Sequence, residues 1–271
     1  MRRGFTLVEI LVALAVLAVL MLAFVGFFGS TLRATGHLKI RNELLSEAQV
    51  AHQLIVGRLK EAWYVWPPGS VLRLANSGWT TQNTLDGGRD WTVGPTFLAM
   101  ILPPQEDGTK CSVDPSGCFR FFAYYPMKRD HYVTNASPVE ALDRDGANDS
   151  RVWVLMEYRA QYRRGGLAAC PVKGDGSPKP GETAYRGRRG RLLLDYVQPL
   201  SDPWDPRYDY AALFEYRTDA GRVSAVTVHL RLARKARERV YRIPVEPGSL
   251  VLTASPKNLG VAARTTAPYC Q

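Results

Sequence analysis

Residues 4–28 read GFTLVEILVALAVLAVLMLAFVGFF, and this stretch decides how the rest of the chain is built. From Ile10 to Phe28 the one residue that is not plainly apolar is Gly26. As a helix, the segment from Phe5 to Phe28 would be about 36 Å long, which is enough to cross a hydrocarbon layer of about 30 Å. The sequence therefore predicts a single membrane-spanning helix here.

The residues around this segment predict its orientation. Arg2 and Arg3 precede it, and cationic residues stay on the cytoplasmic side of a membrane. Residues 29–33 read GSTLR, which contains no good small-residue cleavage site, so the apolar segment is expected to stay on the mature protein. We therefore expect a single-pass membrane protein with a cytoplasmic N-terminus and everything after residue 30 outside the cytoplasm.

Glu9 is the one ionisable residue within the apolar segment. A charged group inside a membrane helix is a functional-site hypothesis by default. The alternative is that its carboxylate simply reaches the interface, because it lies only about 6 Å of helix rise from Phe5. Its position alone leaves both interpretations open.

The string from Gly4 to Leu14 resembles the class III leader junction of type IV pilins and pseudopilins. That family has a short basic leader ending in glycine, then phenylalanine, then glutamate at the fifth mature position, then an apolar helix; Gly4, Phe5 and Glu9 match in register. The resemblance implies that a prepilin peptidase cuts between Gly4 and Phe5 and methylates the new Phe5 amine. It also implies that Glu9 pairs with the Phe5 amine of a neighbouring subunit during assembly.

A second, amphipathic pattern continues the helix beyond the membrane. Apolar residues recur at three- and four-residue steps as far as Trp66, and Pro67-Pro68-Gly69 then stops the helix. The expected organisation is a leader at 1–4, a helix at 5–66 that is membrane-spanning at 5–28, and an extracytoplasmic head at 67–271.

Beyond Gly69 the pattern changes to strands without intervening helices, which favours an antiparallel sheet. Between Val226 and Leu232 apolar residues alternate with Thr227, His229 and Arg231, which predicts that these three point outward. The fold class expected is α+β, a long N-terminal helix packed on a β-sheet head, as in pilins. The predicted strands are Phe97–Leu102, Phe119–Tyr125, Arg151–Tyr162, Leu192–Val197, Leu213–Arg217, Val223–Leu232 and Leu250–Leu252.

The cysteines all follow the membrane segment, and an even number in an exported domain suggests disulfides. Three pairings are open. Turn-forming residues between Cys111 and Cys118 favour a local pair, which would leave Cys170 with Cys270. A zinc site is the rival interpretation, and it lacks a tight Cys-x-x-Cys pair and nearby histidines.

The net charge of +10 is concentrated in two segments. Residues 163–191 hold eight Lys/Arg against two Asp/Glu, and residues 231–242 hold six Lys/Arg against one Glu. Such segments attract polyanions or anionic lipids, although a solvated basic surface is the plainer interpretation. Four arginines near Tyr185 and Tyr196 are candidate nucleic-acid contacts through phosphate neutralisation and stacking: Arg186, Arg188, Arg189 and Arg191.

No catalytic or cofactor motif stands out, so we expect neither enzyme activity nor a cofactor. Asp143, Asp145 and Asp149 superficially resemble a calcium loop, but their spacing departs from the helix-loop-helix pattern and a solvated turn is favoured. The four histidines, His37, His52, His131 and His229, do not group in sequence and are expected at the surface.

The head of about 200 residues has a size similar to the large minor pilins of the PilW type and the J-type pseudopilins. The resemblance implies a minor pilin that primes or joins a type IV pilus, with twitching motility and natural transformation as the associated functions. The alternatives are a minor pseudopilin of type II secretion and a DNA-binding receptor subunit of a transformation pilus. The partners implied are other pilins or pseudopilins, the prepilin peptidase, an inner-membrane assembly platform, the lipid bilayer and, for the receptor, DNA.

Overall fold

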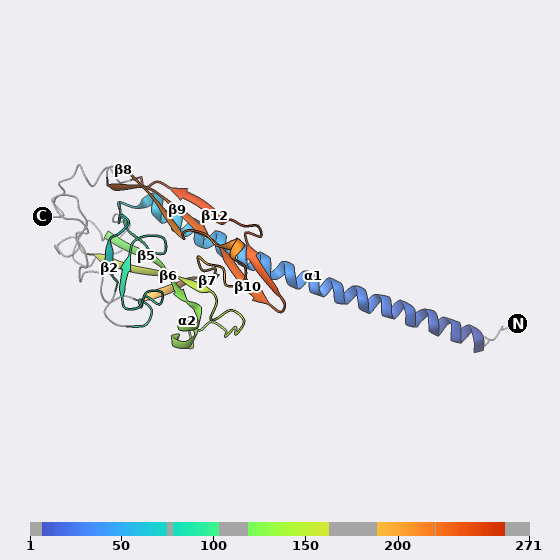
Figure 1. Ribbon diagram of the computed structural model, residues 1–271. Helices are drawn as coiled ribbons and strands as arrows, with labels where there is room; N and C mark the ends of the chain where they lie inside the picture. The colour runs from blue at the N-terminus through green and yellow to red at the C-terminus, as the bar shows by residue number, and fades with distance from the viewer. Residues whose placement is uncertain (1–6, 75–77, 103–118, 163–188, 220, 258–271) are drawn as a thin grey trace. The chain divides into compact units, whose positions relative to one another are not determined.

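The computed structural model describes residues 7–74, 78–102, 119–162, 189–219 and 221–257. The chain divides into two compact units, residues 1–43 and residues 44–271. Helix α1 (Leu7–Glu61) provides the described part of the first unit and continues into the second, which holds the strands (Figure 1). The prediction of an α+β fold, with a long N-terminal helix and an antiparallel β-rich head, is confirmed.

In the first unit, α1 is apolar along one continuous stretch. The window Leu7–Phe28 has a mean hydropathy of 3.0 and no buried side chain within its unit. By length and composition this stretch is able to cross a membrane. A helix that is apolar on all sides and has no protein around it needs an apolar environment from lipid or from other helices.

In the second unit, α1 ends at Glu61 and not at the predicted Trp66. The chain turns there to join the sheet: Trp63 N donates to Ile101 O at 2.7 Å, and Trp66 N donates to Ala99 O at 3.1 Å. The backbone N–H groups of Trp63 and Trp66 therefore find their acceptors in the sheet, and not in a further turn of helix.

The large sheet has seven antiparallel strands in the order β1-β4-β5-β6-β7-β10-β11. Four of them correspond to predicted strands, whereas β1, β11 and most of β10 were not predicted. Their bounds are β1 (Tyr64–Val65), β4 (Leu98–Leu102), β5 (Phe119–Lys128), β6 (Trp153–Tyr162), β7 (Gly190–Val197), β10 (Leu232–Ala236) and β11 (Arg239–Ile243).

Two smaller sheets and two short helices complete the described head. The three-stranded sheet has the order β12-β9-β8, and the two-stranded sheet pairs β2 with β3. The pair β2–β3 and the helix α2 escaped prediction because they are short. The bounds are β2 (Val71–Arg73), β3 (Asp90–Thr92), α2 (Arg129–Asn135), η3 (Pro206–Tyr208), β8 (Phe214–Asp219), β9 (Arg222–Leu230) and β12 (Leu250–Ala254).

The seven-stranded sheet buries side chains on both faces. One face holds an aromatic core that includes Trp66, Trp91 and Phe121, with Trp91 and Phe97 stacked at 5.4 Å between ring centroids. The other face meets the second half of α1, where Ala48, Ile55 and Leu59 are fully buried. A strand buried on both faces reads as a nearly continuous apolar run, which explains why β4 and β5 were predicted from sequence.

The predicted strand Val223–Leu232 is in fact two strands in different sheets. It breaks at Arg231: β9 ends at Leu230 in the three-stranded sheet, and β10 begins at Leu232 in the seven-stranded sheet. The alternation within β9 is confirmed, because Val226, Val228 and Leu230 are fully buried. The break lets one run of chain join both sheets.

Candidate functional site

Glu9 lies in the first turn of α1 and is exposed. It is the one charged residue between Leu7 and Phe28. Apolar side chains from the following two turns lie beside it: Ile10, Ala13, Leu14 and Leu17. A carboxylate within such an apolar surface is costly unless a cation or water meets it, so Glu9 is a candidate functional residue. Gly4 and Phe5 lie outside the described residues.

A buried ion pair attaches α1 to the large sheet. Arg58 of α1 pairs with Glu157 of β6, and their side chains are 16% and 3% exposed. Tyr124 of β5 shares this contact: it accepts from Arg58 Nη1 at 2.5 Å and donates to Glu157 Oε2 at 3.1 Å. Arg58 also lies 4.2 Å above the Phe122 ring. Burial lowers the pKa of Arg58, so the Glu157 charge is needed beside it.

The acidic loop that resembled a calcium site is held by arginines. Buried Arg129 makes two hydrogen bonds to the Asp195 carboxylate, at 2.9 and 3.0 Å, and pairs with Asp149. Burial opposes the charge of Arg129, but the hydrogen bonds and charge of Asp195 outweigh it and raise its pKa. Asp145 accepts from Tyr196 Oη at 3.0 Å.

Two of the three candidate calcium ligands are therefore already used by internal contacts. Asp143 contributes its backbone carbonyl, which accepts from Arg129 at 3.1 Å. Within the described ranges, no group of three or more His, Cys, Asp or Glu side chains is arranged to hold a metal ion. These contacts give the acidic loop a structural role, and calcium binding, the less favoured interpretation of the sequence, stays untested.

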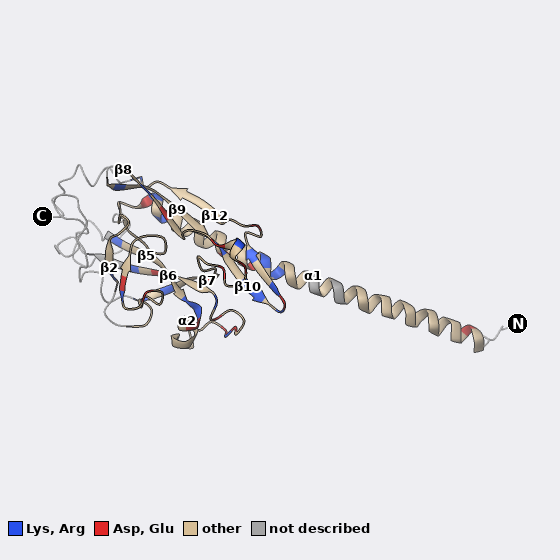
Figure 2. Cartoon of the chain, viewed as in Figure 1, with Lys and Arg blue, Asp and Glu red and all other residues tan. Residues whose placement is uncertain are grey.

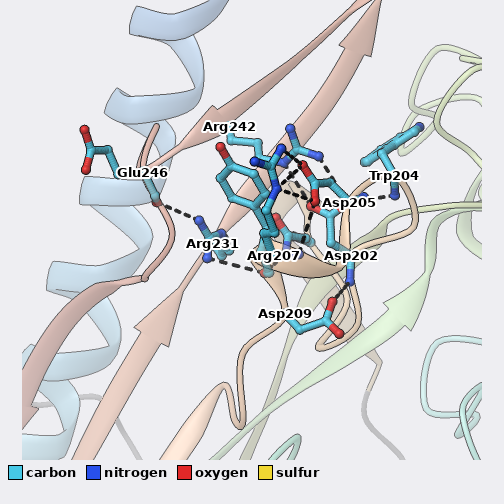
Figure 3. Close-up of polar contacts among 10 residues, drawn as sticks. Asp202, Trp204, Asp205, Arg207, Asp209, Arg231, Arg242 and Glu246 are labelled. Carbon is cyan, nitrogen blue, oxygen red and sulfur yellow. Dashed lines mark hydrogen bonds and ion pairs between the residues drawn. The ribbon is translucent and has the colours of Figure 1, made fainter.

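A second arginine network holds the chain between β7 and β8 (Figure 3). The buried Asp202 carboxylate accepts two hydrogen bonds from Arg242, at 2.9 and 3.2 Å. Asp202 also accepts from the backbone N–H groups of Trp204 and Asp205, at 2.7 and 2.9 Å. One carboxylate thus orders a tight turn and joins it to β11.

Arg231 was predicted to point outward, and this is wrong. It is fully buried and donates to the backbone carbonyls of Glu246, at 2.8 Å, and Tyr208, at 3.4 Å. Its guanidinium lies 4.9 Å from the centre of the Tyr208 ring, and the guanidinium of Arg242 lies 4.2 Å from the centre of the same ring. The break between β9 and β10 turns Arg231 inward, where carbonyls and an aromatic ring replace water.

His52 was predicted at the surface, and it is buried. Its Nε2 lies 2.9 Å from Val228 O, so the imidazole connects α1 to β9. Burial lowers the pKa of His52, and the neighbouring His229 lowers it further. The folded head therefore favours the neutral imidazole.

This burial makes the stability of the head pH-dependent. Above the ordinary pKa of about 6.5, His52 is neutral in both the folded and the unfolded chain; below it, the unfolded chain binds the proton more readily, so stability falls. The wild-type Tm should drop by a few degrees more than that of His52→Gln between about pH 7 and about pH 5. His37→Gln is the control and should retain the full drop. Equal profiles for wild type and His52→Gln would contradict the assignment.

A Ser–His–Glu arrangement crosses the outer face of the three-stranded sheet, and sequence spacing did not indicate it. His229 Nδ1 lies 2.9 Å from Ser249 Oγ, and Nε2 lies 3.2 Å from Glu215 Oε2. Glu215 has a side chain that is 70% exposed, unlike the buried carboxylate that orients a catalytic histidine. The arrangement connects β8, β9 and the start of β12.

The described part of the basic segment lies at the start of β7. Arg189 and Arg191 are exposed, and Arg191 is paired in register with Glu157 of β6. Arg159, two residues along the same strand, is half exposed. Arg159 was not among the nucleic-acid contacts predicted from sequence. The register between β6 and β7 is what brings it near Arg191. The remaining candidates, together with every cysteine, lie outside the described residues: Arg186, Arg188, Cys111, Cys118, Cys170 and Cys270.

The fold defines a class of protein: one that combines an apolar N-terminal helix, able to cross a membrane by its length and composition, with a β-rich head. Residues 1–25 match the family model described as the prokaryotic N-terminal methylation motif. The chain is also 39% identical over 203 residues to the pilin-like protein PilA3 of Thermus thermophilus. This match covers 74% of this chain and 69% of that relative. No solved structure matches the chain.

The chain belongs to the type IV pilin family. Membership implies processing by a prepilin peptidase and assembly with other pilins, and the motif and the apolar helix support a membrane-anchored, pilus-associated protein. Proteins of this family are structural and not enzymes.

Proposed function

We propose that this chain is a minor pilin that primes or joins a type IV pilus. The observation that carries the proposal is the N-terminal motif, in which Gly4, Phe5 and Glu9 stand in register in the sequence at the start of an apolar segment, in a chain whose described head holds three sheets. The peptidase cuts between Gly4 and Phe5 and methylates the Phe5 amine. The apolar helix then packs against other pilin helices above the inner-membrane assembly platform, and the head makes the contacts that distinguish this subunit.

In this proposal Glu9 sets the axial register between subunits. After cleavage, the Phe5 amine is cationic and lies near the membrane face, where a carboxylate attracts it strongly and an unpaired charge is costly. A subunit that is displaced along the bundle loses the pair, so the correct register is favoured.

Replacing Glu9 with alanine should lower incorporation into filaments by on the order of tenfold or more, because the Phe5 amine of the neighbour is left unpaired at a low-dielectric boundary. Immunoblots of sheared filaments, compared with total membranes, measure this. Val12→Ala is the matched control on the same helix and should assemble normally. Normal incorporation of Glu9→Ala would remove the proposed role.

A deletion strain tests the proposed function as a whole. We expect loss of piliation and twitching with secretion unaffected. If piliation and transformation survive while secretion fails, the protein is a minor pseudopilin of type II secretion, which is the alternative within the same family.

A DNA-receptor role is a second candidate, favoured by the exposed arginines at the start of β7. Arg191 is in register with Glu157 of β6, and Arg159, which pairs with Glu157, lies two residues along the same strand, so Arg189, Arg191 and Arg159 come from adjacent ends of two paired strands. Guanidinium groups neutralise phosphates and stack on bases.

For this candidate, DNA affinity should fall steeply with salt, and the double change Arg189→Glu/Arg191→Glu should reduce the slope of log affinity against log salt by about 2. Electrophoretic shift or fluorescence anisotropy with the full-length chain in detergent measures it. Arg217→Glu/Arg222→Glu, two exposed arginines in the β8–β9 hairpin, is the control. Unchanged binding after the first pair of changes would exclude these residues as contacts.

A further inference from the structure

A cavity of about 450 Å³ lies in the head beside the first residues of β8. Its lining is largely apolar and includes Pro68, Pro95, Tyr210, Phe214 and Tyr216. A largely apolar cavity with a few polar groups is typical of binding sites in proteins. These five residues, together with Glu215 and His229 of the same lining, are named here the β8 cavity.

Hydrogen bonds hold the walls of the β8 cavity in place. The backbone N–H groups of residues 213 and 214 both donate to Pro95 O, at 2.8 and 3.1 Å, which fixes the turn between β3 and β4 against the start of β8. Tyr210 and Tyr216 donate their hydroxyls to backbone carbonyls at 2.8 and 2.7 Å. Because these hydroxyls are used within the fold, the two tyrosines offer mainly their rings to a ligand.

The β8 cavity also holds a carboxylate. The side chain of Glu215 is 70% exposed, and its Oε2 lies 3.2 Å from Nε2 of His229, whose other ring nitrogen lies 2.9 Å from Ser249 Oγ. Within the described ranges no lysine or arginine forms an ion pair with Glu215, although Arg217 lies two residues along β8. His229 therefore orients the carboxylate and leaves it accessible to a cation from outside.

An accessible carboxylate without a lysine or arginine partner is an exception in a basic chain. The sequence has 35 Lys and Arg against 25 Asp and Glu, so most carboxylates have cations to meet, and Figure 2 shows Lys and Arg spread over the strands of the head. Lysine and arginine also combine an aliphatic stem with a charged end. The stem suits the apolar lining, the charge suits Glu215, and the rings of the lining attract a cation further.

The strand beside the β8 cavity favours a protein segment as the source of this cation. In the three-stranded sheet, β8 lies at one edge and pairs with β9 alone among the described strands. The N–H of Phe214 points to Pro95, away from β9, so Tyr216, two residues along the strand, presents its N–H on the same side. An extended segment can pair with such an edge while one of its side chains enters a neighbouring pocket, which a free amine cannot do.

We propose that the β8 cavity binds a lysine or arginine side chain from an extended segment of a neighbouring pilin. Glu215 selects the charge, and the prolines and aromatic rings of the lining enclose the stem. The contact rests on assembly with other pilins, as the family implies, and it can form in a pilus or in a secretion filament. The phenotype of the deletion strain therefore does not decide it.

Site-specific photo-crosslinking in cells that assemble the filament tests the proposal. The photoreactive residue p-benzoylphenylalanine replaces Ala211, which is exposed and lines the same cavity. We expect an adduct with a pilin, in which mass spectrometry places a lysine or arginine next to the linked residue. Glu215→Gln should lower the yield of this adduct by on the order of tenfold, because the partner's cation then loses its anion.

Asp219→Asn is the matched control, because Asp219 is an exposed carboxylate at the other end of β8 and does not line the cavity. It should retain the adduct, with yields normalised to the amount of each variant in the membrane. Glu215→Lys should abolish the adduct, and replacing the mapped cation of the partner with glutamate should restore it. No adduct, an adduct unchanged in Glu215→Gln, equal loss in Asp219→Asn, or a mapped segment without lysine or arginine would each overturn the proposal.

Discussion

Replacing Arg129 with methionine is expected to destabilise the head by about 3–5 kcal/mol, because the change leaves two partly buried carboxylates without a cation. Asp195 and Asp149 have side chains that are only 13% and 19% exposed, and both pair with Arg129. Their mutual repulsion and desolvation then oppose folding. The Tm of the full-length chain in detergent, followed by near-ultraviolet circular dichroism, should fall by on the order of 10 °C.

Arg144→Met is the matched control for this experiment. Arg144 is exposed and lies in the same loop as Asp143 and Asp145, and its removal should change stability by less than about 0.5 kcal/mol. The double variant Arg129→Met/Asp195→Asn should lose less than the sum of the two single variants, because both changes act on one contact. Additive losses would mean that Arg129 stabilises the head by packing alone.

The second large effect is expected at Glu157. Glu157→Gln keeps the shape of the side chain but removes the charge that balances Arg58 and Arg159, so we expect a loss of about 3–5 kcal/mol. Burial also raises the pKa of Tyr124 to about 12, so its hydroxyl stays neutral and cannot replace the missing charge. The same detergent unfolding assay measures the loss.

Removing both charges should restore most of the stability lost at this site. In Arg58→Met/Glu157→Met, two apolar side chains of similar length fill the space between α1 and β6, and no buried charge is left. Arg73→Met provides the contrast, because the Arg73–Asp90 pair is exposed on β2 and β3, and its loss should leave the Tm nearly unchanged. A double variant as unstable as Glu157→Gln would show that the ion pair itself stabilises the contact.

Local pattern was sufficient for much of this protein. The apolar segment, the motif around Gly4, Phe5 and Glu9, and most long strands are properties of contiguous residues, and the family comparison agrees with the motif. Short elements such as β2, β3 and α2 escaped prediction, since three to seven residues carry too little periodicity to be distinguished from loops.

The buried charges were missed for a different reason. A charged residue is predicted at the surface unless something neutralises it, and the partners here are distant along the chain: Arg129 meets Asp195, and Arg242 meets Asp202. The available signal was a lone carboxylate within an apolar strand. Glu157 within VLMEY and Asp195 within LLLDY both follow this pattern.

The sequence by itself determined the anchored helix, its assembly motif and the antiparallel, β-rich character of the head, because each depends on neighbours within a few residues. Only the tertiary structure decided that His52 and Arg231 are buried and that the acidic loop is held by Arg129. Burial of a polar group depends on whether hydrogen-bond and charge partners from other elements replace water. Those partners are brought together by the packing of strands and helix, which no local pattern encodes.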